Sequence, residues 1–203
     1  MMREWSVVTY LEQISHQEKR QRLNDLVMIC LLLIAGVLLG LFSKYIDSLP
    51  EGYLPILVEN LRIDRLMSRM PIWLCLALTI ALYSRTPLKA SISVFLFFSG
   101  LIGSYYWYSA VVLGIFSSSK IIYWLWFTLL SPVLAYLCWY VNLKNKFSLF
   151  LSVCILLVLA YYTFIDGTKT FGQIYLLDVL VLIIACIMIG KTRYKKTANS
   201  LKN

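Results

Sequence analysis

Long apolar runs recur along the chain, and short polar or charged stretches separate them. This pattern is typical of membrane helices, because a spanning α-helix needs about 20 consecutive and mostly apolar residues. The expected spans are residues 26–42, 66–83, 90–116, 121–141, 147–164 and 174–190. The pattern predicts an all-α, polytopic integral membrane bundle of about six transmembrane helices.

The second span contains an uninterrupted apolar run of only 13 residues, from Pro71 to Tyr83. It has to include Leu66–Met70 to reach the thickness of a bilayer, and we expect Arg69 to extend outward so that its charge stays in water. Pro71 would then kink this helix near its beginning.

The first 24 residues are too polar to span a bilayer. Val7, Leu11 and Ile14 recur at the spacing of one helical face, which predicts an interfacial amphipathic helix. We therefore expect a cytoplasmic amphipathic arm at residues 1–24, a six-helix transmembrane domain at 25–190 and a basic cytoplasmic tail at 191–203.

Composition supports the membrane class and sets an orientation. Hydrophobic residues make up 60% of the chain and charged residues 14%, which is more apolar than a soluble domain. The net charge of +9 comes from basic residues at the ends of the apolar runs, where they suit anionic lipids better than nucleic acid. Placing both termini in the cytoplasm puts most Lys and Arg residues on that side. We expect a bacterial cytoplasmic membrane protein whose partners are the bilayer and other membrane subunits.

Small residues predict where helices approach one another closely. Gly36 and Gly40 form a G-x-x-x-G pattern that leaves one helical face without side chains. The third span carries two further pairs at the same spacing, Ser99 with Gly103 and Gly100 with Ser104. We expect these six residues to pack helices together and the third span to lie at the centre of the bundle.

Aromatic residues crowd the third and fourth spans, and the fourth contains Pro132. This proline cannot donate a hydrogen bond to the Thr128 carbonyl, so a bend is expected, with the Ser131 hydroxyl bonding locally. A bent, aromatic helix beside a small-residue face would line a cavity between the third, fourth and sixth spans. The candidate ligand-binding residues are Tyr106, Trp107, Trp126, Tyr136 and Asp178.

Asp178 is the carboxylate that lies clearly inside an apolar run. An acidic side chain within the membrane is expensive and marks a functional site by default. We expect it to face the protein interior and to be hydrogen-bonded by Tyr161, Tyr162 or a tyrosine of the third span. Because it lies about one turn from the start of its helix, headgroup water is an alternative partner.

Catalytic, metal and cofactor signatures are missing from the sequence. The five cysteines fall in apolar runs without a C-x-x-C pair, which predicts neither disulfides nor a metal site. His16 stands alone in the polar arm, and no second acid accompanies Asp178. No cofactor is expected, and a non-enzymatic protein is favoured.

Between residues 84 and 140, the stretches SRTPLKA, FLFF, SYYWY, LLSP and CWY resemble a family of small multi-pass bacterial membrane proteins. In size, helix number and small-residue face, the chain is also similar to the substrate-capture subunits of energy-coupling-factor vitamin transporters. Those subunits carry alanines where this chain has Gly36 and Gly40. The resemblance implies a helical membrane fold and transfers no binding residue.

These observations favour a membrane component that binds a small or amphipathic molecule within a transport or envelope complex. Two alternatives stay open. One is a structural or accessory subunit without a ligand, in which the aromatic residues only anchor the protein. The other is a membrane-embedded lipid-modifying enzyme that uses Asp178.

Overall fold

The computed structural model describes residues 2–49, 63–115, 118–143, 145–166 and 176–200. These residues form helices with short connections and contain no strand, which confirms the all-α class. The long helices are α1 (Met2–Ser48), α4 (Met70–Tyr83), α5 (Pro87–Val111), α6 (Ser118–Trp139), α7 (Lys146–Ala160) and α9 (Leu176–Ser200). Shorter elements are α3 (Ile63–Met67), the 3₁₀ turn η1 (Tyr140–Asn142) and the π-helical turn η2 (Tyr161–Asp166).

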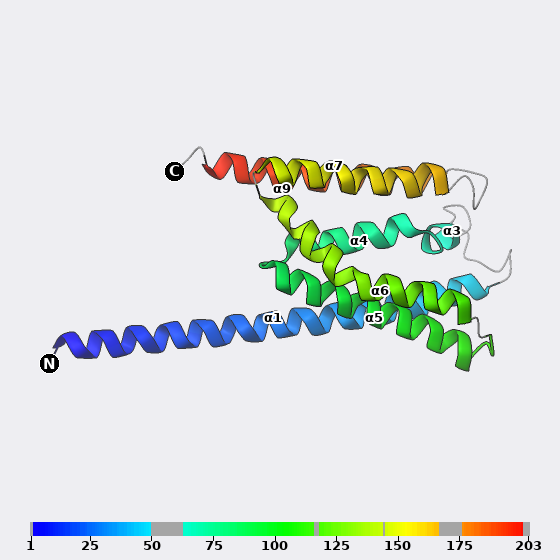
Figure 1. The fold of residues 1–203 in the computed structure, drawn as a ribbon. Coiled ribbons are helices and arrows are strands. Elements are labelled where there is room, and N and C mark those ends of the chain that lie inside the picture. Colours follow the sequence, from blue (N-terminus) through cyan, green and yellow to red (C-terminus); the bar gives the residue numbers. More distant parts are fainter. Residues whose placement is uncertain (1, 50–62, 116–117, 144, 167–175, 201–203) are drawn as a thin grey trace.

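Successive long helices run in opposite directions, so both termini lie at one end of the bundle (Figure 1). The connections from α4 to α5 and from α6 to α7 lie at that end as well. Within the described residues, four stretches are long and apolar enough to cross a membrane: Lys19–Ser48, Pro87–Val111, Ile121–Asn142 and Lys146–Ile165. α4 is apolar but shorter. The helical bundle is confirmed, whereas six crossings and their orientation stay predictions.

The N-terminal arm is not a separate interfacial helix. α1 continues without a break from Met2 into the first apolar run, and its beginning projects past the other helices (Figure 1). The sequence between Gln17 and Leu26 contains no Gly or Pro, and its Glu, Lys, Arg and Gln residues are good helix formers. Nothing in the local sequence therefore ends the helix where the polarity changes.

The second span also begins differently from the prediction. α3 ends at Met67, Arg69 has an extended backbone with φ −106° and ψ 151°, and α4 starts at Met70. Pro71 lies in the first turn of α4, where its missing N–H has no cost. It therefore marks the start of the helix instead of kinking one that began at Leu66.

Two other helix ends differ from expectation. α5 stops at Val111, short of Phe116, and Gly114 follows with a left-handed φ of 65° that only glycine adopts easily. The Ser109 hydroxyl donates to the Ile115 carbonyl at 2.9 Å and fixes this ending. α9 continues past Gly190 to Ser200, so the first part of the basic tail is helical.

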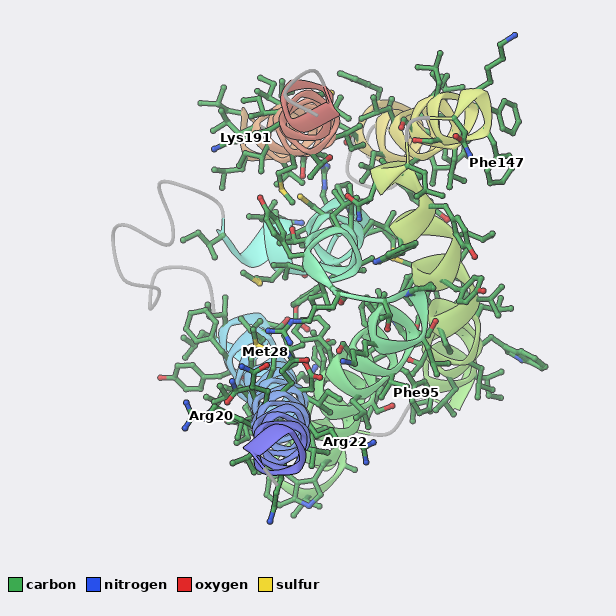
Figure 2. All side chains as sticks on the ribbon, turned by 90° about the vertical axis from the view of Figure 1, so that its left-hand side faces the viewer. Arg20, Arg22, Met28, Phe95, Phe147 and Lys191 are labelled. Atoms are coloured by element: carbon green, nitrogen blue, oxygen red, sulfur yellow. The ribbon has the colours of Figure 1, made fainter. Side chains whose placement is uncertain are left out.

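α4 lies between two groups of helices, with α1, α5 and α6 on one side and α7 and α9 on the other (Figures 1 and 2). Trp73 of α4 belongs to a buried cluster with α5 and α6. Cys75 and Leu78, on the same helix, belong to a second cluster with α7 and α9. The centre of the bundle is therefore α4, whereas the sequence predicted the third span, α5.

The closest helix contact joins α1 to α5, and the predicted small residues form it. Gly36 lies against the backbone of Phe97, and Gly40 lies against the backbone of Leu101. From the other side, a Cβ atom on Gly100 would come within 2.7 Å of the Leu33 carbonyl oxygen. We call this contact the α1–α5 seam. Its glycines leave no room for any side chain, which confirms their predicted packing role.

The remaining small residues of α5 differ in how they contribute to packing. The Ser104 hydroxyl donates to the Val37 carbonyl at 3.0 Å and so strengthens the seam. Ser99 is half-buried. A Cβ atom on Gly103 would meet no atom of the described residues within 4 Å, so Gly103 does not pack as predicted.

α6 continues through Pro132, as the sequence predicted. The Ser131 hydroxyl donates to the Thr128 carbonyl, which the proline leaves without its usual partner, at 2.8 Å. The Pro132 carbonyl in turn accepts from the Ser91 hydroxyl of α5 at 2.8 Å. α6 changes direction along its length and crosses from the α5 side of the bundle toward α7 (Figure 1).

The α1–α5 seam predicts that adding one methyl group lowers the stability of the protein at some glycines and not at others. Gly40→Ala should destabilise the protein by about 1–3 kcal/mol, because the added Cβ meets the Leu101 backbone. Gly103→Ala is the matched control, since it gains the same helix propensity without a clash. Thermal unfolding in mild detergent would compare them. Equal melting temperatures for the two variants would contradict the seam.

Candidate functional site

The structure does not bring the predicted ligand-binding residues together. Trp107 and Trp126 are 57% and 63% exposed on the outer surface. Tyr136 is also exposed, and its hydroxyl accepts from Tyr140 at 3.2 Å. Asp178 is buried on α9, which packs against α4 and α7. The expected site between the third, fourth and sixth spans is therefore wrong, because α4 and α7 separate α9 from the aromatic residues of α5 and α6.

Tyr106 is the predicted residue that does line a cavity. This cavity has a volume of about 480 Å³ and lies at the end of the bundle away from the termini, among α1, α3, α4, α5 and α6. We call it the Asp47 pocket. It is lined by Ser43, Lys44, Asp47, Met67, Ser68, Trp73, Leu101, Ile102, Tyr105, Tyr106, Ser109, Ile115 and Trp124. Ligand pockets in proteins are commonly about 300–1,000 Å³, so a small molecule fits.

Asp47 is the centre of the polar side of this pocket. The Tyr105 hydroxyl donates to Asp47 Oδ2 at 2.9 Å, and the Ser68 hydroxyl donates to Oδ1 at 3.4 Å. Lys44 Nζ lies 3.4 Å from Oδ2 and 5.0 Å from the centre of the Tyr105 ring, where a cation–π contact forms. A cation, an anion and a hydroxyl thus share one small area.

Local helix geometry explains this arrangement. Lys44 and Asp47 lie one turn apart near the end of α1, so both side chains point to the same face. The α1–α5 seam then holds that face beside Tyr105. The side chain of Lys44 is 13% exposed and that of Asp47 39% exposed. The carboxylate therefore keeps room to accept another hydrogen bond.

The rest of the lining of the Asp47 pocket is mostly apolar and aromatic. Trp73 is buried, and its indole N–H donates to the Met67 carbonyl at 2.9 Å, which fixes the ring. Tyr105 and Tyr106 meet edge to face with their ring centres 5.2 Å apart. Leu101, Ile102 and Trp124 supply further apolar lining. The pocket thus offers a polar end with balanced charges and an apolar body.

A second cavity, of about 230 Å³, lies among α4, α5, α6 and α7. Its lining is almost wholly apolar, and the hydroxyl of Ser131 already donates to the Thr128 carbonyl. Such a cavity suits an acyl chain but has little that would orient a specific molecule. The Asp47 pocket is the stronger candidate site.

Asp178 has a partner that the sequence did not suggest. It forms a buried ion pair with Arg69, and the two side chains are 1% and 3% exposed. Two predictions are therefore corrected: Arg69 does not extend outward, and Asp178 is not held by a tyrosine. Arg69 precedes α4 and Asp178 lies in the first turn of α9, and these helices pack together. Burying both charges as a pair avoids the cost of an isolated charge in lipid.

The sequence held a signal for this pair that we did not use. In an up-and-down bundle, the second and sixth spans begin on the same side of the membrane. A lone acid and a lone arginine near those two beginnings lie at similar depth and so can meet. Lys44, Asp47 and Tyr105 were missed for a simpler reason, because they lie at the ends of spans where charged and aromatic residues are ordinary.

Among the described residues, no group of three or more His, Cys, Asp or Glu side chains is close enough to hold a metal ion. All five cysteines are free thiols.

The chain matches no known protein-family profile, no curated protein and no solved structure.

The ion pair predicts strong coupling between Arg69 and Asp178. Asp178→Asn should destabilise the protein by about 3–5 kcal/mol, because it removes the buried carboxylate charge that pairs with the Arg69 guanidinium. The double variant Arg69→Met, Asp178→Leu should recover much of that loss. A double-mutant cycle of Arg69→Met, Asp178→Leu and the double variant, followed by thermal unfolding, would measure the coupling. Additive effects of the two single substitutions would show that the pair contributes nothing.

Proposed function

We propose that this chain is a non-enzymatic, multi-pass membrane protein that binds a small amphipathic molecule in the Asp47 pocket. The observation that carries the proposal is the group of Lys44, Asp47 and Tyr105 in a cavity of about 480 Å³ whose other lining is mostly apolar and aromatic. Membership of a transport or envelope complex is the setting that fits such a role.

A membrane environment is supported by the outer surface of the bundle. Large aliphatic and aromatic side chains are exposed along α1, α6, α7 and α9, among them Leu38, Leu129, Phe150 and Ile184. Water would make such a surface unfavourable, whereas lipid chains solvate it. We propose six crossings, in which α4 and α9 add to the four stretches that are long and apolar enough by themselves.

The charge distribution supports an orientation with both termini in the cytoplasm. Arg85 and Lys89 lie at the connection from α4 to α5, and Lys146 begins α7, all at the same end as the termini. Cytoplasmic connections of bacterial membrane proteins are enriched in Lys and Arg. The Asp47 pocket would then open toward the outer side.

The chemistry of the pocket narrows the class of ligand. Lys44 and Asp47 together carry no net charge, so a neutral or zwitterionic polar group is favoured over a strongly charged one. Such a group would receive hydrogen bonds from Lys44 and donate them to Asp47. An apolar portion would lie against Leu101, Ile102 and the aromatic rings.

The two alternative functions, an enzyme and a structural subunit, assign roles to different residues. An enzyme that relied on Asp178 would need a reactive carboxylate, whereas Asp178 is buried against Arg69. A structural subunit would need no pocket, and the Lys44–Asp47–Tyr105 group would then only fasten α1 to α5.

Orientation is testable with reporter fusions. A green fluorescent protein fused after Asn203 should fluoresce, and alkaline phosphatase inserted between Asp47 and Asp64 should be active, because the two positions lie in opposite compartments. Activity of the same reporter type at both positions would rule out this topology.

Ligand binding is testable by mass spectrometry of molecules that co-purify with the protein in mild detergent. Lys44→Gln and Tyr105→Phe should each retain about tenfold less of the bound molecule, since each removes one polar contact around Asp47. Trp126→Ala is the matched control, because Trp126 is exposed and lies outside the pocket.

Three results separate the proposed functions. Loss from the pocket variants, with retention by Trp126→Ala and unchanged melting temperature, supports the binding protein. A wild-type protein that carries only bulk lipid, in the same amount as all variants, supports the structural subunit. Lipid turnover that disappears in Asp178→Asn at a temperature where the variant stays folded supports the enzyme.

A further inference from the structure

A second amphipathic hollow lies at the opposite end of the bundle, near the chain termini. It has a volume of about 440 Å³ and is formed by α1, the end of α4 and the beginning of α5. We call it the Lys89 groove. Its lining residues are Asn24, Asp25, Met28, Ile29, Leu32, Thr79, Ile80, Tyr83, Ser84, Arg85, Lys89 and Ser93.

Charged and aliphatic residues are separated along the Lys89 groove. Asp25, Arg85 and Lys89 lie at its mouth, where the α4–α5 connection marks the end of the bundle. Met28 and Leu32 follow at one-turn intervals along α1, and Ile80 of α4 lies on the facing wall. This gradient, from charged at the surface to aliphatic within, matches the layering of a phospholipid leaflet.

The cations at the mouth are not all neutralised. Lys89 Nζ bonds Asp25 Oδ2, whereas Arg85 Nη1 lies 3.7 Å from Asp25 Oδ1, which is too long for a hydrogen bond. The side chain of Arg85 is 59% exposed. Its guanidinium therefore has donors in a planar fork that suits a phosphate group.

Further cations lie just above this mouth. Arg22 precedes Asp25 by three residues on α1, and Arg20 and Lys19 by five and six, so at about 1.5 Å per residue all lie within about 9 Å of the Asp25 level. All three are exposed, and Figure 2 looks onto this end of the bundle. Arg85 and Lys89 thus line a groove whose own acid is Asp25, and three more cations lie on the turns of α1 beyond it, so the charge at this end is positive.

We infer that the Lys89 groove binds an anionic phospholipid of the cytoplasmic leaflet. Its phosphate would lie between Arg85 and Lys89, and one acyl chain would lie along Met28, Leu32 and Ile80. Basic pockets between membrane helices on the cytoplasmic side commonly bind acidic lipid headgroups in this manner. The inference rests on the proposed membrane orientation but is independent of ligand binding in the Asp47 pocket.

The test uses the full chain in a neutral detergent with phosphatidylglycerol and phosphatidylcholine of identical acyl chains as probes. Native mass spectrometry would give the apparent affinity for each lipid. We expect preference for phosphatidylglycerol, and Arg85→Gln should weaken its binding about fivefold, because a basic residue near the membrane surface contributes about that factor. Arg85→Lys should retain most of the affinity.

Lys191→Gln is the matched control. Lys191 is an exposed cation at the same end, but on α9 at the far edge of the bundle from α1 (Figure 2). An equal loss in Lys191→Gln and Arg85→Gln would reduce the effect to general surface charge and overturn the groove. Equal binding of the two lipids by the wild-type protein would overturn it as well.

Soluble glycerol phosphate distinguishes a lipid from a free anion. It should fail to displace phosphatidylglycerol at equal concentration, because it lacks the acyl chain that contacts Met28, Leu32 and Ile80. Displacement at equal concentration would show that the site takes free phosphate and not lipid. If variants of the Asp47 pocket keep their ligand, the proposal for that pocket is contradicted but this result is not affected. The two proposals are therefore tested independently.

Discussion

The α1–α5 seam is the contact on which the other arrangements of this chain depend. Gly36, Gly40 and Gly100 let two long helices approach until backbone meets backbone. In a membrane, where lipid chains are as apolar as leucine, such close packing replaces the hydrophobic effect as a source of helix association. Because the contact is backbone to backbone, it fixes the register of α1 against α5 along their whole shared length.

That register places a polar group at each end of the seam. At one end, Asp47 meets the Tyr105 hydroxyl, and at the other, Asp25 meets Lys89. Both acids come from α1 and both partners from α5, so a shift of one turn along the seam would break both pairs. The Arg69–Asp178 pair joins α4 to α9 in the other half of the bundle, independently of α1. Two polar pairs therefore join α1 to α5, and a third joins the beginning of α4 to α9.

The helical class and a close helix contact at Gly36 and Gly40 were predictable, because apolar run length and glycine spacing are local properties of the sequence. The sequence did not identify α5 as the partner in that contact. The candidate site was not. Trp107 and Trp126 were favoured for their chemistry, but whether a side chain faces lipid or protein depends on the neighbouring helix, which periodicity alone does not identify. Arg69 was assigned to water because each span was considered singly, whereas its partner Asp178 lies more than 100 residues away. The predicted helix ends were wrong where a single residue determines the end, as at Arg69 and Gly114.

A photo-crosslinking amino acid at position 106 tests the ligand-binding claim most directly. Tyr106 lines the Asp47 pocket without bonding Asp47, so p-azidophenylalanine there should leave the polar group intact, and position 126 on the exposed face of α6 provides the comparison. After irradiation of intact cells, mass spectrometry of the purified protein should find one small amphipathic adduct at position 106 that is absent at 126. Identical adducts of bulk phospholipid at both positions would contradict the account.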